Sequence, residues 1–234
     1  MRRYLLVDDN RPLAENLAEI LRDMGDEADV AQSGAEALEC AQKHRYDAML
    51  TDMRMPLMDG AELVNRVRHV DAGLPALLLT AYSGDERLRI ARQEGLLAVL
   101  SKPVPVPQLL ETLRTARRDA AIALVEDDVA LCDNLCEALR ARGFTAVAAS
   151  SILEADRIGA VRPFAAVVDL KVPGGPYGEA MRKLAERFPG MPIVVITGNA
   201  EPPPLAPHAI FRKPFDTQAL VELLEGLYRQ RVAA

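Results

Sequence analysis

The chain has 234 residues, of which 50% are hydrophobic and 26% are charged, with a formal net charge of -6. This is an ordinary globular composition, with enough material for one large domain or two of average size. The net negative charge argues against a nucleic-acid-binding surface, and no apolar run approaches the roughly 18 residues that a membrane span requires. The apolar run near the N-terminus is also too short for a signal peptide, so we expect a cytoplasmic protein.

The cysteines and the arginines suggest no special chemistry. Cys40, Cys132 and Cys136 cannot all pair with one another, so we interpret them as small buried hydrophobic residues in a reducing compartment. The nearest approach to a basic cluster is the stretch from Arg114 to Arg118. We interpret it as a solvated helix end whose charges complement the helix dipole.

In the first half of the chain, short β-prone runs alternate with amphipathic helical patterns. The run at 5–7 ends in Asp8-Asp9-Asn10, where Asn10 is placed to cap a helix that Gly25 ends. Further strands are expected near 28–31, 46–52, 75–80 and 96–102, and further helices after Ser33, after Gly60, over 84–93 and over 107–117. About five such alternations predict a parallel sheet with helices on both faces, which is a doubly wound α/β fold.

Polar side chains follow four of these strands, namely Asp8 and Asp9, Asp52, Thr80 and Lys102. The ends of parallel strands meet at one edge of the sheet. Carboxylates this close repel one another unless a cation lies among them, and oxygen ligands at a wet edge suit Mg²⁺. A hydroxyl and an ammonium group beside the metal complete a site for a phosphoryl group, with Asp52 as the nucleophile.

This pattern, together with Pro56 and Asp59-Gly60, resembles the receiver domain of two-component response regulators, the family of the single-domain chemotaxis regulator. The resemblance covers residues 2–118 and implies a flavodoxin-like fold. It implies that Asp8 and Asp9 form an acidic Mg²⁺ pocket, with Asp9 a direct ligand, and that the Arg54 carbonyl is a further metal ligand. It implies that Asp52 is the phosphoacceptor and that the Thr80 hydroxyl moves toward the phosphoryl group. Lys102 would pair with the phosphoryl group, and it precedes a Lys-Pro bond that is often cis in the family. One position departs, because Val99 replaces the aromatic switch residue that is common three residues before the lysine.

The second half of the chain repeats the first. Asp127 follows Asp9 by 118 residues, and Asp169 follows Asp52 by 117, again with a proline four residues after the acid. A repeat of this size predicts tandem domains, which we place at 1–118 and 119–234, each with a five-stranded parallel sheet. By the same resemblance the second site consists of Glu126 and Asp127 in the acid pocket, Asp169 as phosphoacceptor, the carbonyl of Lys171, the hydroxyl of Thr197, and Lys213 before Pro214.

Two segments of the second half differ from the first. From Thr80 to Lys102 there are 22 residues, but from Thr197 to Lys213 only 16, and four of these are prolines that forbid a regular helix. The fourth helix is therefore predicted to be missing or reduced, and with it the family's usual dimer and output surface. The loop after Asp169 holds more glycine and proline than its counterpart, so we expect it to be looser or differently shaped.

The join between the halves is short. Only Asp119-Ala120 separates the last helix of the first half from the strand at Ala121, so we expect a restricted relative orientation. The final helix, with Leu220 and Leu224 facing inward, uses up the chain, so we also expect no effector domain.

These observations predict a two-component response regulator with two receivers, each with a Mg²⁺ site. A histidine kinase or histidine phosphotransfer protein would phosphorylate Asp52 and also Asp169, and output would pass through protein contacts with an unknown downstream protein, with a homodimer as one arrangement. We expect no enzymatic activity beyond self-catalysed phosphotransfer and autodephosphorylation.

Other functions stay open. In one, only the first receiver is phosphorylated and the second is an adaptor or dimerisation module. A Mg²⁺-dependent phosphatase with an aspartyl nucleophile usually carries Asp-x-Asp, whereas Asp52-Met53-Arg54 lacks the second acid. A purely structural scaffold would bind no Mg²⁺.

Overall fold

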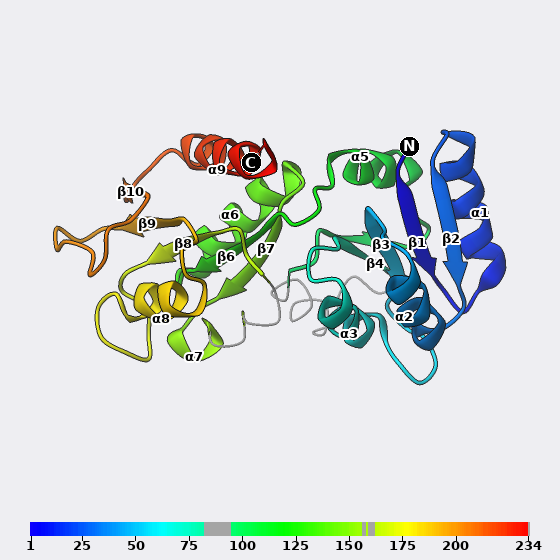
Figure 1. Ribbon diagram of the computed structural model, residues 1–234, viewed down its shortest axis with the longest axis horizontal. Coiled ribbons are helices and arrows are strands. Elements are labelled where there is room, and N and C mark those ends of the chain that lie inside the picture. The colour runs from blue at the N-terminus through cyan, green and yellow to red at the C-terminus, as the bar shows by residue number, and fades with distance from the viewer. Residues whose placement is uncertain (82–94, 156–157, 159–161, 234) are drawn as a thin grey trace. The chain divides into compact units, whose positions relative to one another are not determined.

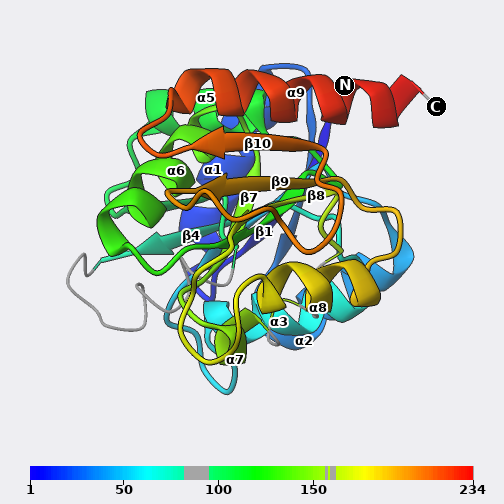
Figure 2. The ribbon, with the colours of Figure 1, turned by 90° about the vertical axis from the view of Figure 1, so that its left-hand side faces the viewer.

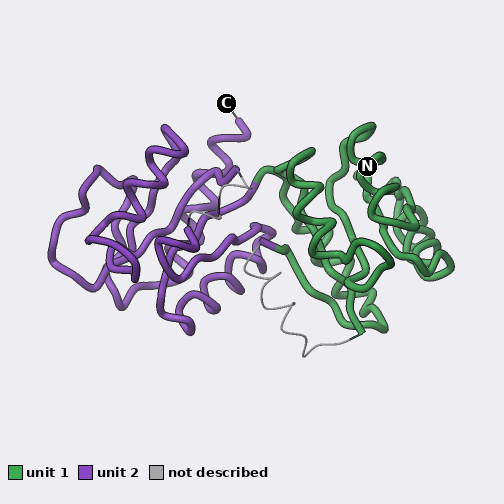
Figure 3. Tube along the Cα trace, turned by 90° about the horizontal axis from the view of Figure 1, so that it is seen from below, with its two compact units in different colours: residues 1–92, 96–119 green, residues 93–95, 120–234 purple. Residues whose placement is uncertain are grey.

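The structure is a computed structural model and describes residues 1–81, 95–155, 158 and 162–233. The chain divides into two compact units, and the boundary between them falls between Asp119 and Ala120 (Figure 3). Each unit contains one five-stranded sheet in which all strand pairs are parallel. The prediction of two doubly wound parallel sheets is therefore confirmed.

The strands of the first unit are arranged in the order β2-β1-β3-β4-β5. Its elements along the chain (Figure 1) are β1 (Arg3–Val7), α1 (Arg11–Asp23), β2 (Glu27–Ala31), α2 (Gly34–Lys43), β3 (Ala48–Asp52), α3 (Gly60–Val70), β4 (Ala76–Thr80), β5 (Ala98–Ser101) and α5 (Val106–Thr115). The helix predicted over 84–93 lies outside the described residues.

Both faces of this sheet are covered because successive side chains of a strand point to opposite faces. Leu5 and Val7 of β1 pack with residues of α2 and α3, whereas Tyr4 and Leu6 pack with residues of α1 and α5. Burial on both faces explains why the strands of this sheet are nearly continuous apolar runs.

Capping side chains begin the first three helices. The side chain of Asn10 accepts a hydrogen bond from the Leu13 N–H, as predicted, and Pro12 lies in the first turn of α1. Ser33 caps α2 and Asp59 caps α3 in the same way.

The strands of the second unit are arranged in the order β7-β6-β8-β9-β10. Its elements are β6 (Ala121–Val125), α6 (Val129–Ala141), β7 (Thr145–Ala149), α7 (Ile152–Ala155), β8 (Ala165–Asp169), α8 (Glu179–Arg187), β9 (Ile193–Thr197), β10 (Ala209–Arg212) and α9 (Thr217–Ala233). Residues of α6 and α9 cover one face of the sheet, and residues of α7 and α8 cover the other (Figure 2).

No helix lies between β9 and β10. Residues 198–208, which the structure describes in full, connect these strands as bends and irregular chain. The predicted loss of the fourth helix from the second unit is confirmed. Its physical reason is the proline content, because each proline lacks the backbone N–H that a helix needs.

The arginine stretch near the junction corrects a prediction. Arg114 is exposed, but Arg118 lies beyond the end of α5 and its side chain is only 15% exposed. The Arg118 Nη2 atom lies 2.7 and 2.6 Å from the two carboxylate oxygens of Asp71, and its Nη1 atom donates to the Tyr46 carbonyl oxygen. The sequence interpretation failed because α5 ends at Thr115, so the next residues are free to turn back onto the first unit.

Other expectations are met in part. The three cysteines are free, but only Cys136 is buried, and Cys40 and Cys132 are partly exposed. Both the Lys102–Pro103 and Lys213–Pro214 peptide bonds are cis. Among the described residues, no helix combines the length and apolar character needed to cross a bilayer.

Candidate functional site

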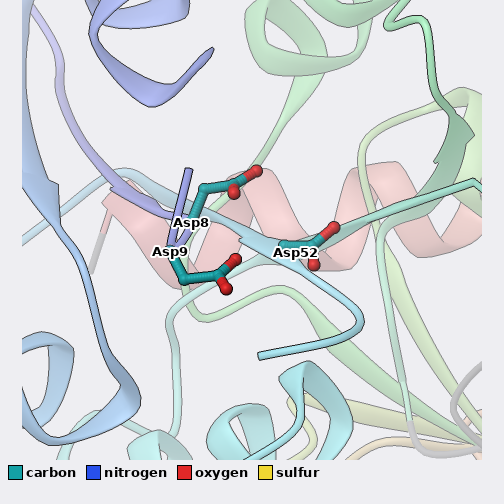
Figure 4. A group of neighbouring side chains, drawn as sticks. All are labelled: Asp8, Asp9 and Asp52. Atoms are coloured by element: carbon teal, nitrogen blue, oxygen red, sulfur yellow. The ribbon is translucent and has the colours of Figure 1, made fainter. Parts of the chain in front are cut away.

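Three carboxylates of the first unit converge at the C-terminal edge of its sheet. Asp8 and Asp9 directly follow β1, and Asp52 is the last residue of β3, the strand that pairs with β1. One carboxylate oxygen from each lies within 4.8 Å of the others (Figure 4). Asp8 and Asp52 are buried, whereas Asp9 is exposed. The site is therefore enclosed on the protein side and open to solvent at Asp9.

Lys102, which directly follows β5, completes this group. The Lys102 Nζ atom lies 2.7 Å from Asp8 Oδ2 and 2.6 Å from Asp52 Oδ1. Burial lowers the pKa of Lys102, but its hydrogen bonds to Asp52 and Asp8 outweigh this effect and the pKa lies above its usual value. Lys102 therefore stays protonated, and its positive charge is shared between the carboxylates of Asp8 and Asp52.

Backbone N–H groups hold the two buried carboxylates in place. The Arg54 N–H donates to Asp52 Oδ2 (2.9 Å), and the Asn10 N–H donates to Asp8 Oδ1 (2.9 Å). Each oxygen that Lys102 leaves free thus has a donor two residues further along the chain. The role of Asn10 was missed in the sequence, although its position directly after the acids and at the helix cap was a usable signal.

The remaining residues of the first site lie at the same edge. Thr80 is the buried last residue of β4, and its carbonyl oxygen accepts from the Lys102 N–H (2.7 Å). Arg54 is exposed, two residues after Asp52. Val99, in the position of the aromatic switch residue, is partly buried and packs against the α2–α3 side of the core. The structure thus brings Asp8, Asp9, Asp52 and Lys102 together, and Thr80 ends a strand at the same edge of the sheet.

The second unit builds the same arrangement from its own strand ends. Glu126, Asp127 and Asp169 place one carboxylate oxygen each within 4.8 Å of the others. The Lys213 Nζ atom lies 2.7 Å from Glu126 Oε2 and 2.5 Å from Asp169 Oδ2. The Lys171 N–H donates to Asp169 Oδ1 (2.8 Å), as Arg54 does to Asp52.

Two groups of the second site have shifted pKa values. Burial raises the pKa of Glu126, and Lys213 opposes this shift without cancelling it. Burial lowers the pKa of Lys213, but the hydrogen bonds to Asp169 and Glu126 raise it above its usual value. Thr197 is buried at the end of β9, and its carbonyl oxygen accepts from the Lys213 N–H (3.0 Å).

Both groups have the donor set that Mg²⁺ prefers. They consist only of oxygen atoms, each includes one exposed carboxylate, and each can leave coordination positions to water. The adjacent lysine and backbone N–H groups suit a second anionic group at the same edge. Chemically, each site offers oxygen ligands for a divalent cation beside one enclosed carboxylate.

Comparison with known proteins gives consistent results. A family model described as "Response regulator receiver domain" matches residues 4–114. A response regulator receiver protein of Anaeromyxobacter sp. (strain Fw109-5) is 59% identical over 231 residues, which cover 99% of this chain and 97% of that protein. The chemotaxis protein CheY of Halobacterium salinarum is 30% identical over 112 residues, covering 48% of this chain and 93% of the relative.

Some relatives are much longer than the matched part. The transcriptional regulatory protein GlrR of Escherichia coli (strain K12) is 34% identical over 122 residues, and the match spans only 28% of its length. Among solved structures, the chemotaxis protein CheY4 of Vibrio cholerae superposes on 49% of this chain with a TM-score of 0.46 and 35% identity.

Proposed function

The chain belongs to the response-regulator receiver family, and from this premise we propose that it is a phosphoryl-accepting regulator with one acceptor carboxylate in each unit, Asp52 and Asp169. The observation that carries the proposal is the pairing of each acceptor with a charged lysine. Lys102 lies 2.6 Å from Asp52, and Lys213 lies 2.5 Å from Asp169. The same chemistry thus recurs at equivalent strand ends of both sheets.

The proposed transfer uses the acceptor as nucleophile. An oxygen of the Asp52 carboxylate forms a bond to phosphorus, the P–N bond of a phosphohistidine donor breaks, and the imidazole keeps the electron pair and takes up a proton. Lys102 remains charged throughout and can pair with a phosphoryl oxygen. The Thr80 hydroxyl would donate to another of these oxygens.

The acidic residues would hold Mg²⁺ during this transfer. Asp8, Asp9 and Asp52 are the candidate side-chain ligands in the first unit, with the Arg54 carbonyl as a further candidate; Glu126, Asp127, Asp169 and the Lys171 carbonyl are their counterparts. When bound, Mg²⁺ would neutralise part of the charge that the carboxylates and the phosphoryl group bring together. The donor would be a histidine kinase or a histidine phosphotransfer protein, and the signal would pass to a downstream protein by direct contact.

Intact-mass spectrometry tests this proposal. The full chain is incubated with acetyl phosphate and Mg²⁺ as wild type, Asp52→Asn and Asp169→Asn. We expect two phosphoryl groups on the wild type and one on each variant. A single group that is lost only in Asp52→Asn would instead favour the alternative in which the second unit is an adaptor, and no phosphorylation at all would overturn the proposal.

A further inference from the structure

Two loops of the second unit contact each other beside the second site. We name the first, residues 170–178, the acceptor loop, and the second, residues 198–208, the proline segment. The Tyr177 hydroxyl donates to the Glu201 carbonyl oxygen (2.9 Å). Next to it, a Cβ atom added to Gly178 would lie 2.6 Å from Pro204 Cδ, so the proline ring lies directly over this glycine. Adjacent residues of the acceptor loop thus both contact the proline segment.

The proline segment is connected to the hydroxyl of the site. The Asn199 N–H donates to Thr197 Oγ1 (3.1 Å), while the Asn199 carbonyl oxygen accepts from Arg212 Nη1 (2.6 Å). A displacement of the Thr197 hydroxyl therefore either breaks this hydrogen bond or moves Asn199 with it. Because Glu201 is only two residues further along the chain, a movement of Asn199 would also strain the bond between Tyr177 and Glu201.

The acceptor loop is in turn connected to Asp169. The Gly178 N–H donates to the carbonyl oxygen of Leu170, the residue after Asp169 (2.7 Å). This bond closes the loop, so Tyr177 stands at its end and at the start of α8. The Tyr177 hydroxyl therefore links the acceptor loop, which follows Asp169, to the proline segment, which follows Thr197.

Tyr177 occupies a position that serves another purpose in the first unit. There the Gly60 N–H donates to the Met53 carbonyl oxygen (3.0 Å), which is the equivalent bond, so Asp59 is the counterpart of Tyr177. Asp59 caps α3 through a bond from the Glu62 N–H (2.8 Å), whereas α8 has no side-chain cap. Helix α8 thus lacks the side-chain cap that α3 has, and an aromatic side chain that bonds to the proline segment stands at this position instead.

We propose that Tyr177 is a positioning residue that holds the proline segment, and with it Thr197, in its present conformation and thereby slows phosphorylation of Asp169. This inference rests on the proposed function of the second unit, and on the movement of the hydroxyl toward the phosphoryl group that the family resemblance implies. The proline segment occupies the chain position of the missing fourth helix. Its contacts with Tyr177 and Gly178 restrain the acceptor loop.

The test uses the full chain with Asp52→Asn, so that only Asp169 can accept a phosphoryl group. Acetyl phosphate and Mg²⁺ are added; an Asp169 oxygen bonds to phosphorus, and acetate leaves with the electrons of the broken P–O bond. The rate is followed by intact mass, and amide hydrogen exchange is measured at residues 198–201. Tyr177→Phe removes only the hydroxyl, whereas Pro204→Ala removes the ring contact with Gly178 and also frees the backbone at residue 204.

We expect both variants to raise hydrogen exchange in the proline segment and to speed phosphorylation of Asp169. For Tyr177→Phe the rate should rise about two- to tenfold, the range that corresponds to the net contribution of one hydrogen bond. Tyr228→Phe is the matched control, since Tyr228 packs with Phe144 and Phe164 on the α6–α9 side of the sheet, and it should change neither quantity.

The inference would be overturned if amide hydrogen exchange at residues 198–201 did not change. It would also be overturned if exchange rose while the rate of Asp169 phosphorylation stayed the same or fell. In both cases the proposed function would stand. A parent protein that takes up no phosphoryl group would overturn both for this unit. The two failures are therefore distinguishable.

Discussion

Asp8 and Glu126 occupy equivalent positions in the two sheets and place a carboxylate oxygen at the same distance, 2.7 Å, from the site lysine. Glu126 is fully enclosed, at 1% exposure, and its other oxygen accepts from the Asp128 N–H (3.1 Å). In both units the lysine is therefore shared between two carboxylates. Lys102 and Lys213 each offset part of the negative charge of their site.

Removal of the lysine should make the first site depend on a metal ion. In Lys102→Met, Asp8 and Asp52 lose their shared cation, and we expect the free energy of unfolding in EDTA to fall by roughly 2 kcal/mol, less than for a fully enclosed pair because Lys102 is 20% exposed. Added Mg²⁺ should raise the free energy of unfolding of this variant by more than that of the wild type. Urea unfolding with and without Mg²⁺ measures both effects.

The control is Lys43→Met, which removes an exposed ion pair with Glu39 and should change stability by less than about 1 kcal/mol. If Mg²⁺ stabilised Lys102→Met no more than the wild type, the three acids would not constitute a cation site.

The ion pair between Arg118 and Asp71 should be a major contributor to the stability of the first unit. Their side chains are only 15% and 18% exposed, and Arg118→Ala would leave the Asp71 carboxylate largely without its cation. We expect Arg118→Ala to lower the free energy of unfolding by about 3 kcal/mol. Arg114→Ala is the matched comparison, because its partner Glu111 and Arg114 itself are mostly exposed, and it should cost less than about 1 kcal/mol. Similar losses for the two variants in chemical denaturation would contradict the structure.

The hydroxyl of Tyr46 should stabilise the first unit in a pH-dependent way. Burial raises the pKa of Asp29, but hydrogen bonds from Tyr46 (2.7 Å) and Arg3 outweigh it, so the pKa lies below its unfolded value of 3.8. A depressed carboxyl pKa contributes stability that is present above the unfolded pKa and is lost as the pH falls through the folded pKa. The destabilisation caused by Tyr46→Phe should accordingly be largest near neutral pH and shrink below pH 3.8.

Measuring the free energy of unfolding of wild type and Tyr46→Phe at neutral and acidic pH gives this difference directly. Tyr177→Phe should show no such trend, since the Tyr177 hydroxyl donates to the Glu201 backbone carbonyl oxygen, which does not titrate. A Tyr46→Phe effect that grows as the pH falls would show that the hydroxyl does not favour ionised Asp29.

Gly60 should be intolerant of a side chain because of its close approach to β3 and β4. A Cβ atom there would clash with the Asp52 carbonyl oxygen and lie 2.7 Å from Leu78 Cδ2. Since the carbonyl belongs to the acceptor residue and cannot yield easily, we expect Gly60→Ala to cost about 2 kcal/mol or more and to impair phosphorylation of Asp52.

Gly226 provides the contrasting substitution. It lies within α9 with nothing within 4 Å of an added Cβ atom, so Gly226→Ala should stabilise the protein by up to about 1 kcal/mol through helix propensity. Thermal unfolding of the two variants should therefore shift in opposite directions, and equal shifts would refute the proposed contact at Gly60.

The sequence alone was sufficient for the alternation of strands and helices, the repeat, and the convergence of the site residues. These features are local or topological: fully buried strands are continuous apolar runs, and parallel topology brings strand ends such as Asp8 and Asp52 to one edge. The loss of a helix before β10 was also predictable, because several prolines within one short segment prevent a regular helix by their missing N–H groups and ring clashes.

Only the tertiary structure decided which groups pair across long separations. The contact of Arg118 with Asp71, the sharing of Lys213 between Glu126 and Asp169, and the bond from Tyr177 to Glu201 join residues 24 to 87 positions apart. Side-chain identity does not specify such partners, because an arginine after a helix or a tyrosine in a loop is equally compatible with solvent. Chain packing determines whether these polar groups lose water, and that in turn determines which contacts they must form.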